Sequence, residues 1–256
     1  MTQWMPQGKA LGTIVFSHGA NLAPLQYLQM IEPLAASGWR VLAPLHTDSE
    51  QHADKASYTG FATWSTRLED MQALSAHIGE GAYVAAGHSY GALTALVLGG
   101  AQALVPKDVK APLADPKVKA VLAFSPPPPI PGFVDMAGYA KLQVPALIQT
   151  GTFDVPLLPG SAIEGPNAGY KGHLAPYNAA AKGGARYALT LEGVDHYYGG
   201  AIGRLKEPSA LNQTQLRETT AITQSFLDAH MLGSSQALAA LQSKLSNDLP
   251  VVLQTK

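Results

Sequence analysis

Residues 83–98 read YVAAGHSYGALTALVL, and this stretch indicates the fold. A short apolar run, Tyr83 to Ala86, leads into Gly87-His88-Ser89-Tyr90-Gly91, and a longer apolar run follows from Ala92. Runs of these lengths predict a buried strand and then a buried helix. Glycines on both sides of a serine are typical of a sharp turn, because larger side chains would collide with the neighbouring strand and helix. We therefore expect Ser89 to project from a strand-to-helix turn, as a nucleophile must.

Five more apolar runs occur along the chain, separated by stretches that can hold a helix. This alternation predicts an α/β fold, with a mostly parallel sheet of about six to seven strands and helices on both faces. Apolar residues at helical spacing occur in Pro24 to Ser37, in Trp64 to Ile78, and in Thr214 to Leu245 with an interruption at Gly233. The five runs are Thr13 to Phe16, Arg40 to Pro44, Val118 to Phe124, Ala146 to Gln149 and Tyr187 to Leu191.

Two proline-containing stretches, Leu104 to Lys117 and Val155 to Tyr170, interrupt this pattern. Neither is long enough to form a separate lid. We expect residues 1–256 to form a single domain without a large cap domain, with an open face above the sheet.

The composition excludes several classes of protein. Formal net charge is -1, so no positive field attracts nucleic acid or anionic lipid. Cysteine is absent, which excludes a thiol nucleophile, a zinc ribbon and an iron–sulfur cluster. The longest apolar stretch, Ala92 to Val105, is shorter than the ~20 residues that a membrane span needs. We expect neither nucleic acid nor a membrane as partner. The first residues lack a signal-peptide layout, which favours the cytoplasm unless a signal has been trimmed, and the oligomeric state is not indicated.

A serine hydroxyl needs a histidine base and an orienting acid before it can attack an acyl carbon. His196 follows the last predicted strand, and Asp154 follows the strand before it. The carboxyl ends of parallel strands meet at one edge of the sheet, so the order Ser89, Asp154, His196 brings the three together. We expect Asp154 to be the acid. The rivals are Asp135, which follows an earlier strand, and Glu192 and Asp195, which are too near His196 in sequence.

The other histidines have plainer interpretations. We expect His18 to brace the turn after the first strand and His88 to pack under the serine turn. His46 could ligate a metal with Asp48 and His52, but a loop of this polarity usually faces solvent, and a fourth ligand is lacking. We therefore predict no metal site. Ordinary surface or partly buried positions are expected for His77, His173 and His230.

An attacked carbonyl also needs backbone N–H groups that stabilise its developing negative charge. One such donor is the N–H of Tyr90, directly after the serine and at the start of the next helix. The other is expected in the turn Ser17-His18-Gly19-Ala20-Asn21, with Ala20 N–H as the best candidate.

Four segments of the chain carry a family pattern, namely Val15 to Ala20, Gly87 to Gly91, Gly151 to Asp154 and Val194 to His196. Together they resemble the α/β-hydrolase superfamily, and the resemblance covers Thr13 to about Gly200. It implies that the segments are the oxyanion loop, nucleophile turn, acid turn and histidine loop. The chain is most similar to the dienelactone-hydrolase-like and platelet-activating-factor-acetylhydrolase-like esterases, through Phe16-Ser17-His18-Gly19 and Arg67-Leu68-Glu69-Asp70. It differs from dienelactone hydrolase in having Ser89 in place of a cysteine.

These residues predict a serine hydrolase that cleaves carboxylic esters through an acyl-enzyme without a cofactor. The expected pocket residues carry no charge, which favours a small to medium, neutral apolar or aromatic ester. Alternatives on the same triad are a thioesterase, an amidase, a lactonase or a hydroxynitrile lyase, and a noncatalytic ligand-binding protein is a remoter one. The expected pocket residues are Leu22, Tyr58, Tyr90, Phe153, Leu157 and Tyr197.

Overall fold

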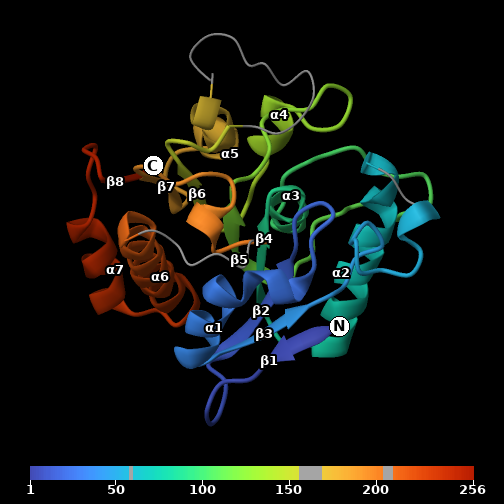
Figure 1. Cartoon of the computed structure of the whole chain (residues 1–256), viewed down its shortest axis with the longest axis horizontal. Coiled ribbons are helices and arrows are strands. Elements are labelled where there is room, and N and C mark those ends of the chain that lie inside the picture. The colour runs from blue at the N-terminus through green and yellow to red at the C-terminus, as the bar shows by residue number, and fades with distance from the viewer. Residues whose placement is uncertain (58–59, 156–168, 204–209) are drawn as a thin grey trace.

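One eight-stranded sheet runs through the molecule, in the order β1-β3-β2-β4-β5-β6-β7-β8 (Figure 1). The computed structural model describes residues 1–57, 60–155, 169–203 and 210–256. Its parallel strands are β2 (Gly12–Ser17), β3 (Trp39–Ala43), β4 (Tyr83–His88), β5 (Val118–Phe124), β6 (Ala146–Gly151) and β7 (Arg186–Leu191). The two edge strands, β1 (Thr2–Trp4) and β8 (Val251–Thr255), pair antiparallel with β3 and β7.

Helices cover both faces of the sheet, and each face has its own apolar core (Figure 1). Alternate residues of a strand point to opposite faces, so Val15 joins one core while Ile14 and Phe16 join the other. The core with Val15 includes residues of α2 (Trp64–Ile78), α3 (Tyr90–Leu98), α4 (Met136–Tyr139) and α5 (Ala175–Ala179). The opposite core includes residues of α1 (Leu28–Ala36), α6 (Ala210–Met231) and α7 (Ser235–Ser243).

The predicted alternation of strands and helices is confirmed. The six apolar runs form β2 to β7, and the three helical patterns form α1, α2 and the pair α6 and α7. Gly233, with φ 70°, separates that pair, and Ser234 Oγ accepts the Ala237 N–H to start α7. The sheet has more strands than the six to seven predicted. The additional strands are the edge strands β1 and β8, which are stabilised by pairing with a neighbouring strand more than by their own sequence.

The stretch Leu104 to Lys117 has no helix or strand, as predicted. Most of Val155 to Tyr170 lies outside the described residues, and the described part of the chain shows no cap domain. No helix among the described residues is long and apolar enough to cross a membrane.

Candidate active site

The strand-to-helix turn holds Ser89 in an unusual backbone conformation. Strand β4 ends at His88, α3 begins at Tyr90, and Ser89 between them has φ 55° and ψ -118°. Few non-glycine residues adopt positive φ, and such strain concentrates at functional sites. Ser89 is also the one residue of the continuous stretch 83–101 that is not buried.

The flanking glycines are needed because the turn is tightly packed. A Cβ on Gly87 would overlap the Gly91 carbonyl oxygen, and a Cβ on Gly91 would overlap the carbonyl oxygen of Ser17. Ser17 is the last residue of β2 and pairs with Gly87 in the parallel register. The turn after β2 therefore lies directly against the serine turn.

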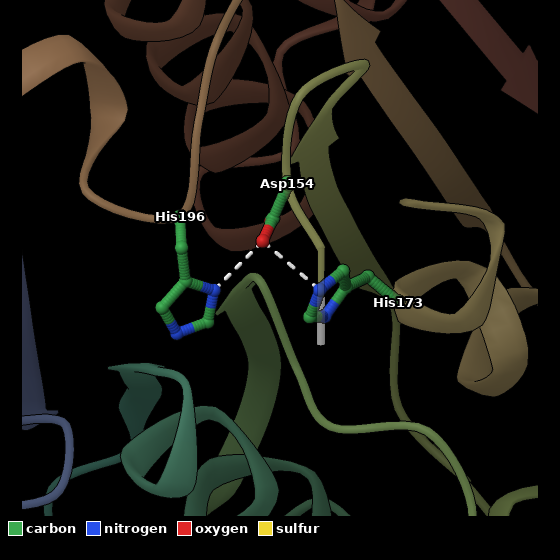
Figure 2. A group of neighbouring side chains, drawn as sticks. All are labelled: Asp154, His173 and His196. Carbon is green, nitrogen blue, oxygen red and sulfur yellow. Dashed lines mark hydrogen bonds and ion pairs between the residues drawn. The ribbon is translucent and has the colours of Figure 1, made fainter. Parts of the chain in front are cut away.

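Asp154 and His196 meet at the carboxyl ends of β6 and β7 (Figure 2). His196 Nδ1 lies 2.7 Å from Asp154 Oδ1, and Thr150 donates to the other carboxylate oxygen at 2.8 Å. Because Nδ1 donates to the carboxylate, Nε2 of His196 remains an acceptor. Among the described residues, the hydrogen bonds of His196 go to Asp154 and His88, and none joins it to Ser89 Oγ. Bonds between a nucleophile and its base are often loose before substrate binds.

His173 is a third member of this group, and its predicted ordinary position is wrong. Its side chain is only 2% exposed, and Nε2 lies 2.9 Å from the same Asp154 Oδ1 (Figure 2). Its Nδ1 lies 2.7 Å from the Pro126 carbonyl oxygen. Burial alone would raise the pKa of Asp154, but the two histidines beside the carboxylate, His173 and His196, hold that pKa well below its usual range. Nothing in the sequence around His173 marks it, because its partners are 19 and 47 residues away.

His88 does more than pack under the turn. Gly19 N–H donates to the Tyr27 hydroxyl at 2.8 Å, and that hydroxyl lies 2.9 Å from His88 Nδ1. His88 Nε2 lies 2.8 Å from the His196 carbonyl oxygen, so Nε2 carries the proton and Nδ1 accepts one from Tyr27. Burial lowers the pKa of His88 well below its ordinary value, which fits a neutral ring. One chain of hydrogen bonds thus links the turn after β2, the serine turn and the His196 loop.

His46 and Asp48 are buried, so the expectation that their loop faces solvent is wrong. His46 Nδ1 lies 2.7 Å from Asp70 Oδ2, and its Nε2 lies 2.8 Å from Ser17 Oγ. Burial lowers the pKa of His46 well below its ordinary value and raises the pKa of Asp70 to about 6. His52 is partly exposed and contacts Asp54 instead. The group thus fastens the end of β2 to α2.

Arg67 is also completely buried, although it lies off the apolar stripe of α2. Its Nη2 lies 2.8 and 2.7 Å from the two oxygens of Asp48, and Nη1 donates to the His18 carbonyl at 2.8 Å. The guanidinium lies over the ring of Tyr90, 4.4 Å from its centroid. His18 braces the loop as predicted, because its Nε2 accepts the His46 N–H and its Nδ1 donates to Gly19. Arg67 thus holds the turn after β2 against the start of α3.

The two expected oxyanion donors lie on these neighbouring turns. Ala20 is exposed, and its N–H has no acceptor among the described residues. Tyr90 is the first residue of α3, where a helix leaves its N–H groups without intrahelical acceptors. The structure therefore places these two N–H groups on neighbouring segments, the turn after β2 and the start of α3, which pack against each other.

The expected pocket residues have different surroundings. Phe153 is 69% exposed beside Asp154, and Tyr197 packs edge-on against the His196 ring at 5.7 Å. Leu22 and Tyr197 both pack partly buried against the core that contains Phe16. The Tyr90 ring is buried among Arg67, Trp64 and Phe61. Tyr58 and Leu157 lie outside the described residues.

The acidic residues considered as alternatives to Asp154 have other contacts or face solvent. Asp135 accepts the Gly138 N–H at 2.7 Å and caps α4. Asp195 accepts the N–H groups of Tyr197 and Gly199 within its own turn, and Glu192 is exposed. The remaining expectations for histidines hold, since His77 is exposed and His230 is partly buried.

Asp154, His173 and His196 could also be considered as metal ligands, since their ligand atoms lie within 4.8 Å of one another. His196 Nδ1, however, is hydrogen-bonded to Asp154 Oδ1 at 2.7 Å, and His173 Nε2 lies 2.9 Å from the same oxygen, which leaves no space for an ion between them. Zinc would require deprotonated nitrogens about 2.0–2.1 Å from the ion. The arrangement fits a hydrogen-bonded group better than a metal centre, and the absence of a metal remains a prediction.

Comparisons with known proteins extend these observations. No protein-family model matches the chain, and no curated protein matches it in sequence. Among solved structures the chain is similar to Est1E from Butyrivibrio proteoclasticus, whose structure has ferulic acid bound. The two are 14% identical with a TM-score of 0.59, over 90% of this chain and 94% of Est1E. The likeness shows that this chain has the α/β-hydrolase fold.

Proposed function

We propose that this protein is a serine hydrolase of carboxylic esters, with Ser89 as nucleophile, His196 as base and Asp154 as the acid that orients His196. In this proposal the N–H groups of Ala20 and Tyr90 stabilise the oxyanion, and no cofactor takes part. The observation that carries the proposal is the 2.7 Å contact between His196 Nδ1 and Asp154 Oδ1, at the same edge of the sheet as Ser89. It leaves Nε2 of His196 free to accept a proton.

The reaction proceeds in two halves. Ser89 Oγ attacks the ester carbonyl carbon while His196 Nε2 takes the hydroxyl proton. The C–O bond to the alcohol breaks, and His196 returns that proton to the departing oxygen. Water then attacks the acyl-enzyme in the same way, which releases the carboxylic acid and restores Ser89. Both tetrahedral intermediates place their negative oxygen near the two N–H groups.

Strain at Ser89 supports its role as the nucleophile. Ser89 has a left-handed backbone with φ 55° and is the partly exposed residue of a stretch that is otherwise buried. Fixed packing around Gly87 and Gly91 holds the serine in place before substrate binds. A nucleophile that is positioned in advance loses little entropy in the reaction.

The substrate class follows from the surroundings of the site. We propose a small to medium neutral ester with an apolar or aromatic acyl group, because uncharged side chains such as Phe153 and Tyr197 flank Asp154 and His196. The similar structure Est1E holds ferulic acid, an aromatic acid, and this supports aromatic esters as test substrates. Thioesters, amides, lactones and cyanohydrins are the alternative substrates for the same residues.

Covalent labelling combined with an ester panel tests the proposal. The wild-type protein should hydrolyse p-nitrophenyl and hydroxycinnamate esters, and an organophosphonate should add one adduct mass on the peptide that contains Ser89. Ser89→Ala should lose both properties, whereas Ser243→Ala, on the exposed end of α7, should keep both. Activity should survive a chelator.

Some results would contradict the proposal. An adduct on another serine would move the nucleophile, and activity that disappears with the chelator would favour a metal at Asp154. If the protein binds esters without turning them over, the noncatalytic alternative is correct. Parallel assays with thioesters, anilides, lactones and cyanohydrins separate the enzyme classes.

A further inference from the structure

Two of the six phenylalanines have exposed side chains, and the other four are buried. Phe153, beside Asp154, is 69% exposed and is one of the pocket residues expected from the sequence. Phe61 is 39% exposed and is not among those expected residues. It lies three residues before Trp64, where α2 begins. Single exposed apolar side chains are common on protein surfaces, so a role for Phe61 depends on what it contacts.

Phe61 belongs to a group of four aromatic side chains, which we call the aromatic wall: Phe61, Trp64, Tyr90 and Phe133. The Phe61 ring packs edge-on against Tyr90 with centroids 5.4 Å apart, and its centroid is 4.6 Å from that of Phe133. Trp64 stacks on Tyr90 at 5.9 Å and packs against Phe133 at 5.2 Å. Aromatic rings attract one another at centroid distances of about 4.5–7 Å. Phe61 is the exposed member of the wall, and the other three rings are buried.

Polar contacts hold the buried members of the aromatic wall in place. Leu104 N–H donates to the Phe133 carbonyl at 2.7 Å, and Trp64 Nε1 donates to the Leu104 carbonyl at 2.8 Å. The Arg67 guanidinium lies over the Tyr90 ring, 4.4 Å from its centroid. The exposed member therefore has a fixed support. An apolar surface that is fixed in advance loses little conformational entropy when a ligand covers it.

The aromatic wall and the proposed base lie on opposite sides of Ser89. His88, directly before Ser89, packs edge-on against Tyr198, which belongs to the core formed with α1, α6 and α7. The His196 ring lies against His88 with centroids 4.7 Å apart. Tyr90, directly after Ser89, belongs instead to the core formed with α2 and α3. The two neighbours of the serine thus point to opposite faces of the sheet.

The proposed mechanism determines which half of the ester faces the aromatic wall. The tetrahedral carbon formed on Ser89 carries the serine oxygen, the oxyanion, the alcohol oxygen and the acyl chain. The oxyanion faces the N–H groups of Ala20 and Tyr90, and the alcohol oxygen faces His196 Nε2, from which it receives its proton. The side away from His196 is left for the acyl chain. We propose that Phe61 determines the acyl specificity, and that the aromatic wall binds an acyl chain that ends in an aromatic ring.

This inference rests on the proposed function, and paired substrates test it in the active protein. The ratio of kcat/KM for methyl hydrocinnamate over methyl propanoate reports on the acyl side. The ratio for phenethyl acetate over ethyl acetate reports on the alcohol side. Phe61→Ala should lower the acyl ratio by about tenfold and leave the alcohol ratio unchanged, because it removes apolar surface that the acyl chain alone covers. Phe61→Tyr keeps the ring and should keep the acyl ratio.

A matched control and a binding assay complete the test. Leu232→Ala removes another exposed apolar side chain, directly after α6, and should keep both ratios. Ser89→Ala lacks the proposed nucleophile, so calorimetry on this variant measures the affinity for intact methyl hydrocinnamate. Adding Phe61→Ala to it should raise Kd by about tenfold, whereas adding Leu232→Ala should not change Kd. Circular dichroism confirms the fold of each variant.

The outcomes separate this inference from the proposed function. An acyl ratio that Phe61→Ala leaves at the wild-type value would overturn the inference, and so would a fall in the alcohol ratio instead. A Kd that does not depend on Phe61 would also overturn it. If the protein binds methyl hydrocinnamate through Phe61 but hydrolyses no ester, the proposed function fails and the aromatic wall remains a binding site.

Discussion

Arg67 Nη2 lies 2.8 and 2.7 Å from the two carboxylate oxygens of Asp48, and both side chains are buried. The same guanidinium donates through Nη1 to the His18 carbonyl, two residues before Ala20. A buried ion pair therefore connects helix α2 to the turn in which we place an oxyanion donor. The pair should matter for both stability and turnover.

Breaking this ion pair from one side should be costly. Asp48→Ala leaves the Arg67 charge buried without its partner, and the free energy of unfolding should fall by about 3–5 kcal/mol. The double variant Asp48→Leu/Arg67→Met removes both charges and should recover much of that loss. Urea unfolding of the wild type, Asp48→Ala and the double variant measures these free energies.

Turnover gives the second readout of the same pair. The double variant should fold but hydrolyse esters with a kcat lowered by about tenfold or more, since a displaced N–H donor no longer faces the oxyanion. Its KM should change less. Wild-type kcat in the double variant would show that Arg67 serves stability alone.

Tyr27 joins two catalytic turns through one hydroxyl. Tyr27→Phe removes the acceptor of Gly19 N–H and the donor to His88 Nδ1, so it should cost about 1–3 kcal/mol of stability and also lower kcat. Tyr83→Phe is the matched control, because Tyr83 is equally buried but lies at the amino-terminal end of β4, where its hydroxyl donates to Asp115. The Tyr83→Phe variant should lose stability and keep the wild-type kcat. Equal effects of the two variants on kcat would rule out a specific role for Tyr27.

The acid can be identified by comparing two conservative variants. Asp154→Asn should retain the fold and lose about 10⁴ in kcat, because an amide holds His196 in the wrong tautomer. Asp135→Asn should have a mild effect, since Asp135 caps α4. Circular dichroism confirms the fold of each. The reverse ranking would assign the acid to the earlier strand.

Stability should fall in mild acid because three histidines are buried as neutral rings. Burial lowers the pKa of His18, His46 and His88 well below the ordinary value of 6.5. Below about pH 6.5 the unfolded chain binds protons that the folded chain does not, so unfolding becomes easier by about 1.4 kcal/mol per pH unit for each histidine. Asp70 acts in the opposite sense between its ordinary pKa of 3.8 and its raised pKa of about 6, because there the folded chain holds the extra proton. The net slope should correspond to about two protons.

Urea unfolding between about pH 5 and 8 measures this slope. His88→Gln should reduce the slope by one proton, whereas His77→Gln should leave it unchanged because His77 is exposed. If these rings were protonated in the folded protein, Asp70 alone would set the slope, and stability would instead rise as the pH falls below about 6.

The sequence by itself determined the order of strands and helices along the chain and which three residues form the candidate triad. Apolar runs of four to seven residues between helical patterns are local signals, and each predicted run became a strand from β2 to β7. In a parallel sheet the strand direction sends every following loop to the same edge. The positions of Ser89, Asp154 and His196 after their strands were therefore enough to bring them to that edge.

Edge strands and buried polar groups were decided only by the tertiary structure. Strand β1 is three residues long and β8 is five, and each is stabilised by hydrogen bonds to a neighbour that is distant in sequence. Arg67 illustrates the same limit, because helical periodicity places it off the apolar stripe of α2. The turn after β2 and Asp48 cover it, and neither can be located from the sequence of α2.

His173 shows why buried polar residues with distant partners cannot be identified from the sequence alone. An isolated histidine belongs to no periodic pattern, and the surroundings of His173 depend on two oxygen atoms from Pro126 and Asp154. Those oxygens lie beside the ring because β5 and β6 pair in the sheet and the segment Gly169–Leu174 packs against β6. Local sequence fixes hydrophobic periodicity and turn chemistry, whereas the partner of a buried polar group is fixed by long-range packing, since burying it without that partner would cost free energy.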